Sequence, residues 1–315
     1  MRACGVTFSS QTSSTTYGLK RPDILLQLPT KVTSGLQQSD RPRSGCLAGH
    51  HRPPDLPTRQ ARDPLPLQND AGLPALEDVA VDGFVSFEHS QYHPFHFHVA
   101  VHRPSSFFIH FTDSEVRRSG TMTDKQKRQR AVLERIRGRP DPQAVRKDMQ
   151  ELLEYVTRGA SAMTIHSDDH KAYPRAIRNL RCQIRHLVTS SKDIRNRINK
   201  LFEINLLDLL IRHCEAEHKR ETIAYAKRRN CAAYKLAIFL VLRNYVKTRR
   251  VRKSRQTPAQ LLGVCPRRLT VDEVLARRLF VDQVGLEGRW RQYYWQEVVT
   301  RALKINRRHE LRFAV

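Results

Sequence analysis

The sequence lacks the features that mark membrane, secreted and disulfide-stabilised proteins. No apolar run approaches the roughly 20 residues that span a bilayer, because the apolar run at 236–242 is short and lies between Lys235 and Arg243. The N-terminus has no basic segment followed by an apolar one, so a signal peptide is not expected. The six cysteines are scattered without a C-x-x-C pair, which favours reduced thiols over a disulfide framework or a zinc ribbon. We therefore expect a cytoplasmic protein without a membrane segment.

Negative charge is also scarce. The 315-residue chain has 56 Lys and Arg against 31 Asp and Glu, which gives a formal charge of +25. Such an excess is informative about partners and not about fold, and it favours a polyanion such as nucleic acid. Composition alone fits a ribosomal-type or merely basic protein equally well, so the decision rests on particular residues.

Amino-acid composition and hydrophobic periodicity along the chain predict three parts. Residues 1–75 are rich in Ser, Thr, Gln, Pro and Arg and carry too few apolar residues to form a core, so we expect a disordered or degenerate leader. Residues 76–250 have the periodicity of a folded domain. Residues 251–315 form a basic extension that we expect to be mostly helical.

The folded part mixes strand and helix patterns, which predicts an α/β fold. Runs rich in β-branched and aromatic residues predict five strands, at 75–88, 95–103, 106–113, 162–167 and 183–189. Helical patterns lie at 123–138, 141–159 and 202–249, the last one being either two helices or one with a break. The first three strands follow one another closely and predict an antiparallel meander. In the second strand, alternation puts His96 and His98 on a face that we expect to be exposed to solvent.

Three acids are candidates for a shared cation site. Asp82 lies within an apolar strand, where a carboxylate is costly to bury unless it is paired or metal-bound. Asp168 ends the fourth strand, and Glu221 lies in the late helical pattern. Carboxylates converging on one ion suit Mg²⁺, which takes few protein ligands together with substrate phosphate. On spacing alone, Asp168 and Asp169 also fit a simple turn, and Glu221 also fits a solvated helix face.

Several segments in order resemble the catalytic region of bacterial insertion-sequence transposases of the DDE type. They include VDGFVSFEHSQYHPFHFHVAV, FFIHFTDSEVR, IHSDDHKAYPRAI, the TSSK at 189–192 and LDLLIRHCEAEHKRETIAYAKRR. The resemblance begins near Leu76, includes LTVDEVLARRLF and GRWRQYYWQEV, and extends over roughly three quarters of the chain.

The resemblance implies a ribonuclease H-like domain: a mixed five-stranded sheet, its first three strands antiparallel, flanked by helices. It implies that Asp82, Asp168 and Glu221 are catalytic and hold Mg²⁺ or Mn²⁺, with Glu217 and Glu215 as rivals for the third position. Asp169 is interpreted as the turn residue. The implied reaction is hydrolysis at an element end followed by attack of the freed 3′-hydroxyl on target DNA. The implied partners are element-end and target DNA, and the implied active form is a homo-oligomer on the bacterial nucleoid.

Basic residues late in the chain are candidates for phosphate contacts. We single out Lys219, Arg220, Lys227, Arg228, Arg229, Lys247, Arg249 and Arg250. The same residues also fit a solvated face or a linker. The aromatic residues Trp290, Tyr293, Tyr294 and Trp295 fit either a core or a stacking surface for unpaired bases.

One departure from the family concerns the N-terminus. These transposases commonly carry an N-terminal module that recognises the element ends, whereas residues 1–75 lack the paired cysteines of a zinc ribbon. The alternatives are therefore an active transposase, a truncated or inactive copy that only binds DNA, and a metal-dependent nuclease without strand transfer.

Overall fold

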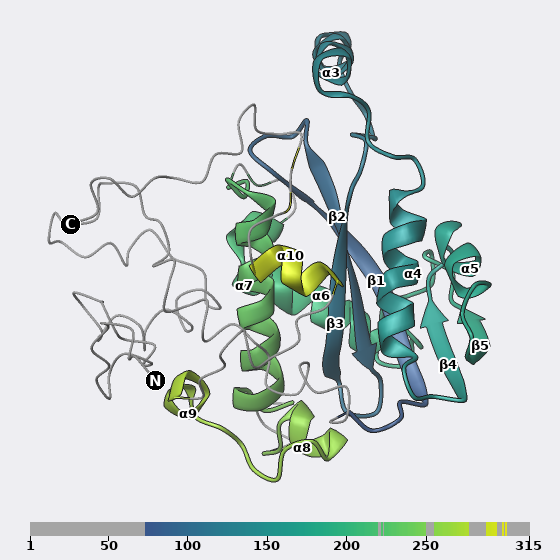
Figure 1. Ribbon diagram of the computed structural model, residues 1–315, viewed down its shortest axis with the longest axis vertical. Helices are drawn as coiled ribbons and strands as arrows, with labels where there is room; N and C mark the ends of the chain where they lie inside the picture. Colours follow the sequence, from purple (N-terminus) through teal and green to yellow (C-terminus); the bar gives the residue numbers. More distant parts are fainter. Residues whose placement is uncertain are drawn as a thin grey trace, which may run out of the picture.

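The described part of the protein is an α/β fold with one mixed sheet. The computed structural model describes residues 73–219, 222, 224–249, 255–276, 288–294, 298 and 300. The predicted leader therefore lies outside the described residues except for its last three positions. Within the described part, helices flank a five-stranded sheet (Figure 1).

The sheet places the fourth strand beside the first. Its strands are β1 (Asp78–Phe87), β2 (Pro94–His102), β3 (Phe107–Glu115), β4 (Ala162–Ser167) and β5 (Gln183–Val188), arranged in the order β3-β2-β1-β4-β5. The pairs β1–β2 and β2–β3 are antiparallel, and the pairs β1–β4 and β4–β5 are parallel. The sequence predicted the meander, but it did not predict that β1 would pair with β4, and this pairing positions the candidate site.

One face of the sheet packs against α4 (Ala144–Val156), and α4 in turn packs against α5 (Ala172–Ile177). Thr112 of β3 fixes this contact, because its hydroxyl donates to the carbonyl of Asp148 on α4 at 2.7 Å. Apolar residues of α4 such as Leu152 and Leu153 are fully buried against the strands.

The opposite face packs against α6 (Phe202–Cys214), the short 3₁₀ helix η2 (Ala216–His218) and α7 (Arg229–Val241) (Figure 1). Ser86 and Phe84 of β1 both contact η2: the Ser86 hydroxyl donates to the Glu217 carbonyl at 3.2 Å, and the Phe84 ring meets the His218 ring edge-on. A π-helical segment, η3 (Leu242–Val246), extends α7.

Three short helices belong to the C-terminal part: α8 (Pro258–Leu262), α9 (Val271–Ala276) and α10 (Gly288–Tyr294). They lie in the part of the chain, residues 251–315, for which the sequence predicted a mostly helical extension. Arg289 of α10 contacts the third strand at Asp113 and α4 at Asp148 and Glu151, so α10 lies where strand and helix meet.

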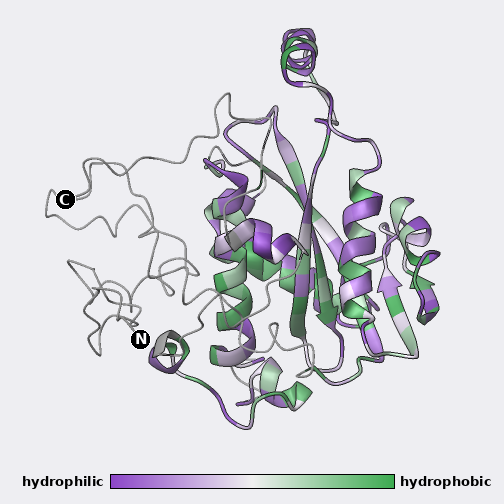
Figure 2. Cartoon of the chain, viewed as in Figure 1, coloured by the Kyte–Doolittle hydropathy of each residue, from purple (hydrophilic) through white to green (hydrophobic). Residues whose placement is uncertain are grey.

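One helix, α3 (Asp124–Arg137), extends from the body of the protein (Figure 1). Thr123 caps it with a full capping box to Gln126. None of its residues is buried, and hydrophilic residues make up much of this helix in Figure 2.

The helical pattern at 202–249 is two helices, which was one of its two predicted forms: α6 ends at Cys214 and α7 begins at Arg229. In between, Ala226 forms a parallel bridge with Glu88 at the end of β1, which requires an extended backbone. The prediction that His98 is exposed to solvent is wrong, because His98 is completely buried beneath α4 and bonded to the Ser114 hydroxyl at 2.7 Å. Alternation identified its sheet face correctly, but it could not show that a helix covers that face.

Within the described ranges, none of the helices combines the length and the apolarity needed to cross a bilayer.

Candidate functional site

The structure brings Asp82 and Asp168 to the same edge of two neighbouring parallel strands. Ala80 of β1 pairs with His166 of β4. Asp82 comes two residues after Ala80, and Asp168 comes two residues after His166. Because parallel strands run in register, this places the two acids level with each other. Two carboxylates 86 positions apart in sequence are thus brought together by the β1–β4 pairing.

The environment of Asp82 favours its protonated form. The pKa of Asp82 is raised to about 7, mainly by burial. The hydrogen bond from the Gly83 amide and the charge of Arg195 act to lower this pKa, and the carboxylates of Asp168 and Asp208 act to raise it. Gly83 donates to Asp82 Oδ1 at 2.7 Å. A cation at this edge would favour ionisation of Asp82, since it would offset both the burial and the like charges.

Gly83 beside Asp82 is fixed by close packing. A Cβ atom at position 83 would lie 2.1 Å from Cε1 of His96 and 2.6 Å from the carbonyl oxygen of Phe97. Only glycine allows β2 to approach this closely. The sequence DG at 82–83 therefore combines a candidate ligand with the residue that permits the strand packing around it.

Asp208 of α6 is a carboxylate that sequence reasoning did not select. It acts electrostatically on Asp82, and both oxygens of Asp208 accept from Arg212 Nε at 2.9 Å. The i, i+4 spacing of Asp208 and Arg212 is the ordinary pattern of a surface pair, so nothing in the sequence distinguished it. Only the packing of α6 on β1 shows that this acid faces the Asp82–Asp168 edge.

The two adjacent aspartates have different contacts. Asp168 Oδ1 accepts from the His170 amide at 3.0 Å, the pattern of a turn that begins at Asp168. Asp169 Oδ2 accepts from the Ser191 amide and hydroxyl at 3.4 and 3.3 Å, and so connects to the loop after β5. The interpretation of Asp169 as the turn residue is therefore wrong, because Asp168 itself makes the turn bond.

That loop brings positive charge to the acids. Arg195 lowers the pKa of Asp82, which shows that the loop lies within electrostatic range of it. Lys192, Arg195, Arg197 and Lys200 are all exposed along this segment. The TSSK segment at 189–192 begins this loop, but the cations of the loop were not among the predicted phosphate ligands.

The predicted third acid, Glu221, lies outside the described residues together with Arg220 and Arg250. Its rival Glu217 does not face the Asp82–Asp168 edge, because its carboxylate is paired with Lys235 of α7. The short helix that carries Glu217 ends at His218, and Lys219 already has an extended backbone.

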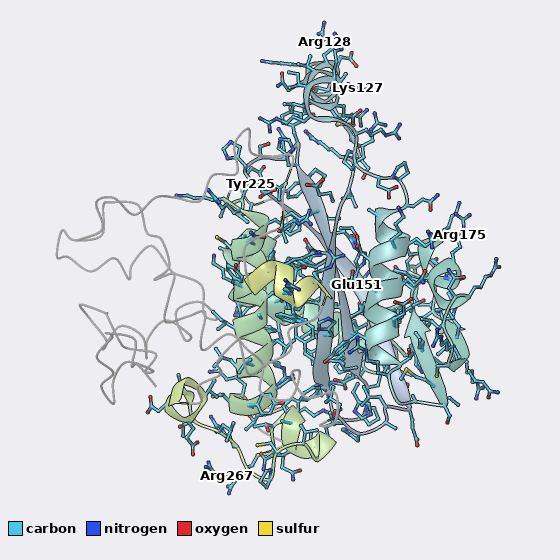
Figure 3. All side chains as sticks on the ribbon, in the orientation of Figure 1. Lys127, Arg128, Glu151, Arg175, Tyr225 and Arg267 are labelled. Carbon is cyan, nitrogen blue, oxygen red and sulfur yellow. The ribbon has the colours of Figure 1, made fainter. Side chains whose placement is uncertain are left out.

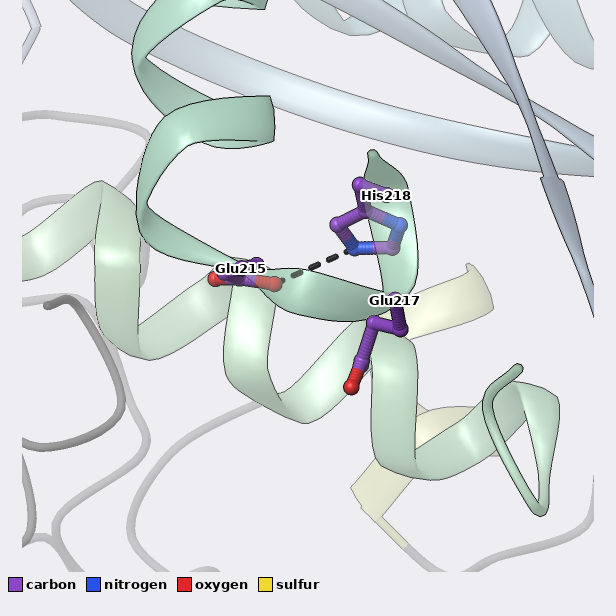
Figure 4. Close-up of side chains that lie close together, drawn as sticks. All are labelled: Glu215, Glu217 and His218. Atoms are coloured by element: carbon purple, nitrogen blue, oxygen red, sulfur yellow. Dashed lines mark ion pairs between the residues drawn. The ribbon is translucent and has the colours of Figure 1, made fainter. Parts of the chain in front are cut away.

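A separate acidic cluster lies on η2 (Figure 4). Glu215, Glu217 and His218 each offer one ligand atom, and these atoms lie within 4.8 Å of one another. Among the described residues, this is the one group of three His, Cys, Asp or Glu side chains that meets so closely. Burial raises the pKa of Glu215 to about 8 and lowers the pKa of His218 to about 4.

The predicted DNA-contacting residues divide into two groups. Lys219, Lys227 and Lys247 are exposed. Arg229 is buried, with its guanidinium paired with Asp113 and Glu115, so it is better explained as part of the core. Arg249 likewise bonds Glu203 at 3.0 Å and the Pro104 carbonyl at 2.8 Å. A run of basic residues in a sequence does not show which cations are exposed to solvent and which neutralise acids within the fold.

Basic side chains also project from several other parts of the surface, as Figure 3 shows for Lys127 and Arg128 on α3, Arg175 on α5 and Arg267 after α8. Tyr293 of α10 is buried and donates its hydroxyl to Asp113, which supports the core interpretation for that residue. Trp295 lies outside the described residues.

No protein-family model matches this chain, and no curated protein matches its sequence.

Proposed function

We propose that this protein is a DDE-type transposase of a bacterial insertion sequence, which cuts element ends and joins them to target DNA. The observation that carries the proposal is the meeting of Asp82 and Asp168. Both were selected from the sequence, and the β1–β4 pairing places them level at one sheet edge. The transposase motifs quoted above supply the reaction class.

The topology supports a ribonuclease H-like identity for the domain. Three consecutive antiparallel strands are followed by β4 and β5, which run parallel to β1. Helices cover both faces of this sheet (Figure 1). These features agree with the fold that the resemblance implies, and they place the acid pair at the carboxyl end of β4.

The donor set at the edge fits a hard divalent cation. Asp82 and Asp168 would hold Mg²⁺ or Mn²⁺, which supplies activation of the attacking oxygen and neutralisation of charge on the phosphodiester. The raised pKa of Asp82 supports this fit, because a carboxylate facing two further carboxylates needs a positive partner to remain ionised at neutral pH. Asp208 lies within electrostatic range of the same edge and would add to its negative potential.

The loop after β5 would position the DNA backbone. Arg195 of this loop lies within electrostatic range of Asp82, and Ser191 contacts Asp169, so a phosphate bound by Arg195 would lie beside the Asp82–Asp168 edge. Such contacts hold the backbone without reading bases. Holding the scissile phosphate beside fixed carboxylates is the main contribution that phosphoryl transfer requires from the protein.

The test is cleavage of end-labelled duplexes that carry the DNA flanking the gene on each side, with Mn²⁺ or Mg²⁺. The expected result is a nick at one defined position, and transfer of the new 3′ end into added plasmid DNA. Asp82→Asn and Asp168→Asn should each lower the rate by at least about 10³-fold, since charge stabilisation is the main catalytic term. Asp169→Asn is the matched control, because Asp169 instead contacts Ser191.

The other outcomes identify the alternatives. Cleavage at random positions would favour a metal-dependent nuclease, and binding without cleavage would favour a non-catalytic DNA-binding remnant. Full activity of Asp82→Asn would overturn the site assignment.

A further inference from the structure

The cluster on η2 contains more negative charge than its protein partners neutralise. Glu215 and Glu217 are both buried, with 2% and 7% of their surface exposed. Lys235 of α7 pairs with Oε2 of Glu217 and accounts for one of the two charges. Neither Glu217 Oε1 nor either oxygen of Glu215 has a hydrogen-bond partner among the described residues. An unpaired buried carboxylate is costly, so Glu215 requires a positive partner: a metal ion or a proton.

The ring of His218 is oriented by β1. The Ser86 hydroxyl donates to the Glu217 carbonyl at 3.2 Å, which uses its only hydrogen. Ser86 Oγ therefore accepts from His218 Nδ1, which lies 2.9 Å away. The proton of the neutral ring is then on Nδ1, and Nε2 carries a lone pair that faces into the cluster. A ligand histidine in a metal site is held in the same way, by a hydrogen bond at its other ring nitrogen.

The contact between the two side chains favours an ion over a proton. Glu215 Oε2 lies 3.1 Å from His218 Nε2. Within the described residues, neither atom has a partner with the geometry of a hydrogen bond. A proton shared between the two side chains requires an N–H···O angle that is close to linear. Two ligands of one ion instead lie side by side, and with metal–ligand distances of about 2.0–2.2 Å they are separated by roughly 3 Å.

We propose that Glu215, Glu217 and His218 form a binding site for one transition-metal dication of the Zn²⁺ class, separate from the Asp82–Asp168 edge. Glu217 can offer Oε1 while its Oε2 remains paired with Lys235. One imidazole and two carboxylates are a ligand set that suits Zn²⁺ better than Mg²⁺. The ion would join Glu215 at the end of α6 to Glu217 and His218 of η2, and His218 is in turn anchored to Ser86 on β1, so the ion would stabilise the junction between these elements.

The site is distinct from the proposed catalytic edge and does not depend on it. Ser86, which anchors His218, is four residues beyond Asp82 on β1, about 13 Å along the strand. Asp82 and Asp168 are not members of the cluster. Removing one site should therefore leave metal binding at the other unchanged, and this separation allows a test that needs no catalytic activity.

The experiment measures metal binding to the full-length chain purified in chelator. Zn²⁺ titration should show one tight site per chain in the wild type and in the Asp82→Asn/Asp168→Asn double variant. Glu215→Gln and His218→Gln should each weaken this site at least about ten-fold, and Ser86→Ala should weaken it less because it removes only the orienting bond. Glu154→Gln, an exposed acid on α4, is the matched control.

A second measurement uses only the wild-type protein, so it does not depend on whether variants of the buried residues fold. Wild-type protein loaded with Co²⁺ should show the visible absorption of a four- or five-coordinate ion and a raised midpoint of thermal unfolding. Absence of that spectrum together with no stoichiometric Zn²⁺ binding would overturn the proposal and assign a proton to the Glu215–His218 pair. Loss of Zn²⁺ binding in the Asp82→Asn/Asp168→Asn variant, with binding retained in Glu215→Gln, would overturn it too.

Discussion

Asp82 is a carboxylate within an otherwise apolar strand, and its environment determines how it responds to pH. Burial and the neighbouring acids raise the pKa of Asp82 to about 7. The folded protein therefore holds the Asp82 proton at pH values where the unfolded chain has released it. Such a group lowers stability as pH rises from its unfolded pKa, near 4, through its folded pKa. This cost in the metal-free protein is what a cation at the site would remove.

In the absence of divalent metal, Asp82→Asn should therefore stabilise the protein above neutral pH. The gain should be near zero at pH 4 and reach roughly 1–3 kcal/mol at pH 8, since the half-buried carboxylate bears only part of the full penalty. Urea unfolding at pH 4, 6 and 8 measures it, with Asp169→Asn as the control. An equal loss of stability at all three pH values would show that Asp82 has a purely structural role.

At the scale of elements, α10 is too short to be stable by itself, because isolated helices below about 12 residues are marginal in water. Its seven residues are fixed by Arg289, whose guanidinium bonds Asp113 Oδ1 at 3.0 Å and Glu151 Oε2 at 2.7 Å, and also contacts Asp148. Trp290 adds a bond from its indole nitrogen to the buried His110 ring at 2.9 Å. Ionic contacts with the core and the packing of Trp290 and Tyr293 on Phe111 together hold α10 in place.

Replacing Arg289 with Met should cost about 3–5 kcal/mol, because it leaves the buried carboxylate of Asp113 without one of its two cations. Arg291→Met, on the exposed side of the same helix, should change stability by less than about 0.5 kcal/mol. Chemical denaturation of the two variants gives the comparison. Similar losses for both would mean that the ionic contacts of Arg289 contribute nothing specific.

At the scale of the whole molecule, basic side chains lie on many surfaces, and some of the 56 Lys and Arg residues are paired with acids. Arg229, Arg249 and Arg289 neutralise acids within the fold. Arg195 in the loop after β5 lies within electrostatic range of Asp82, whereas α3 extends away from the body (Figure 1). If the proposed function is right, this loop and not α3 contacts the DNA beside the acids.

DNA binding at the loop should appear in its salt dependence. For a duplex of about 12 base pairs, the Lys192→Ala/Arg195→Ala/Arg197→Ala variant should reduce the slope of log K against log salt by roughly 3 × 0.9. The Lys125→Ala/Lys127→Ala/Arg128→Ala variant on α3 removes the same charge and should leave the slope nearly unchanged. Fluorescence anisotropy at salt concentrations from about 50 to about 300 mM measures the slope for both variants. The reverse ranking would place the DNA on α3.

The sequence by itself determined the strands and two of the acids. Alternation and β-branched residues identify β1 to β5, because a half-buried strand must alternate whatever it pairs with. Asp82 and Asp168 could be selected because an acid inside or at the end of an apolar strand is unusual. Only the tertiary structure decided which strands pair, that Asp208 faces Asp82, and that Arg229 and His98 are buried. It also decided that the chain between Cys214 and Arg229 leaves the helix and buries Glu215, Glu217 and His218. These features depend on contacts between segments far apart in the chain, which local periodicity does not record.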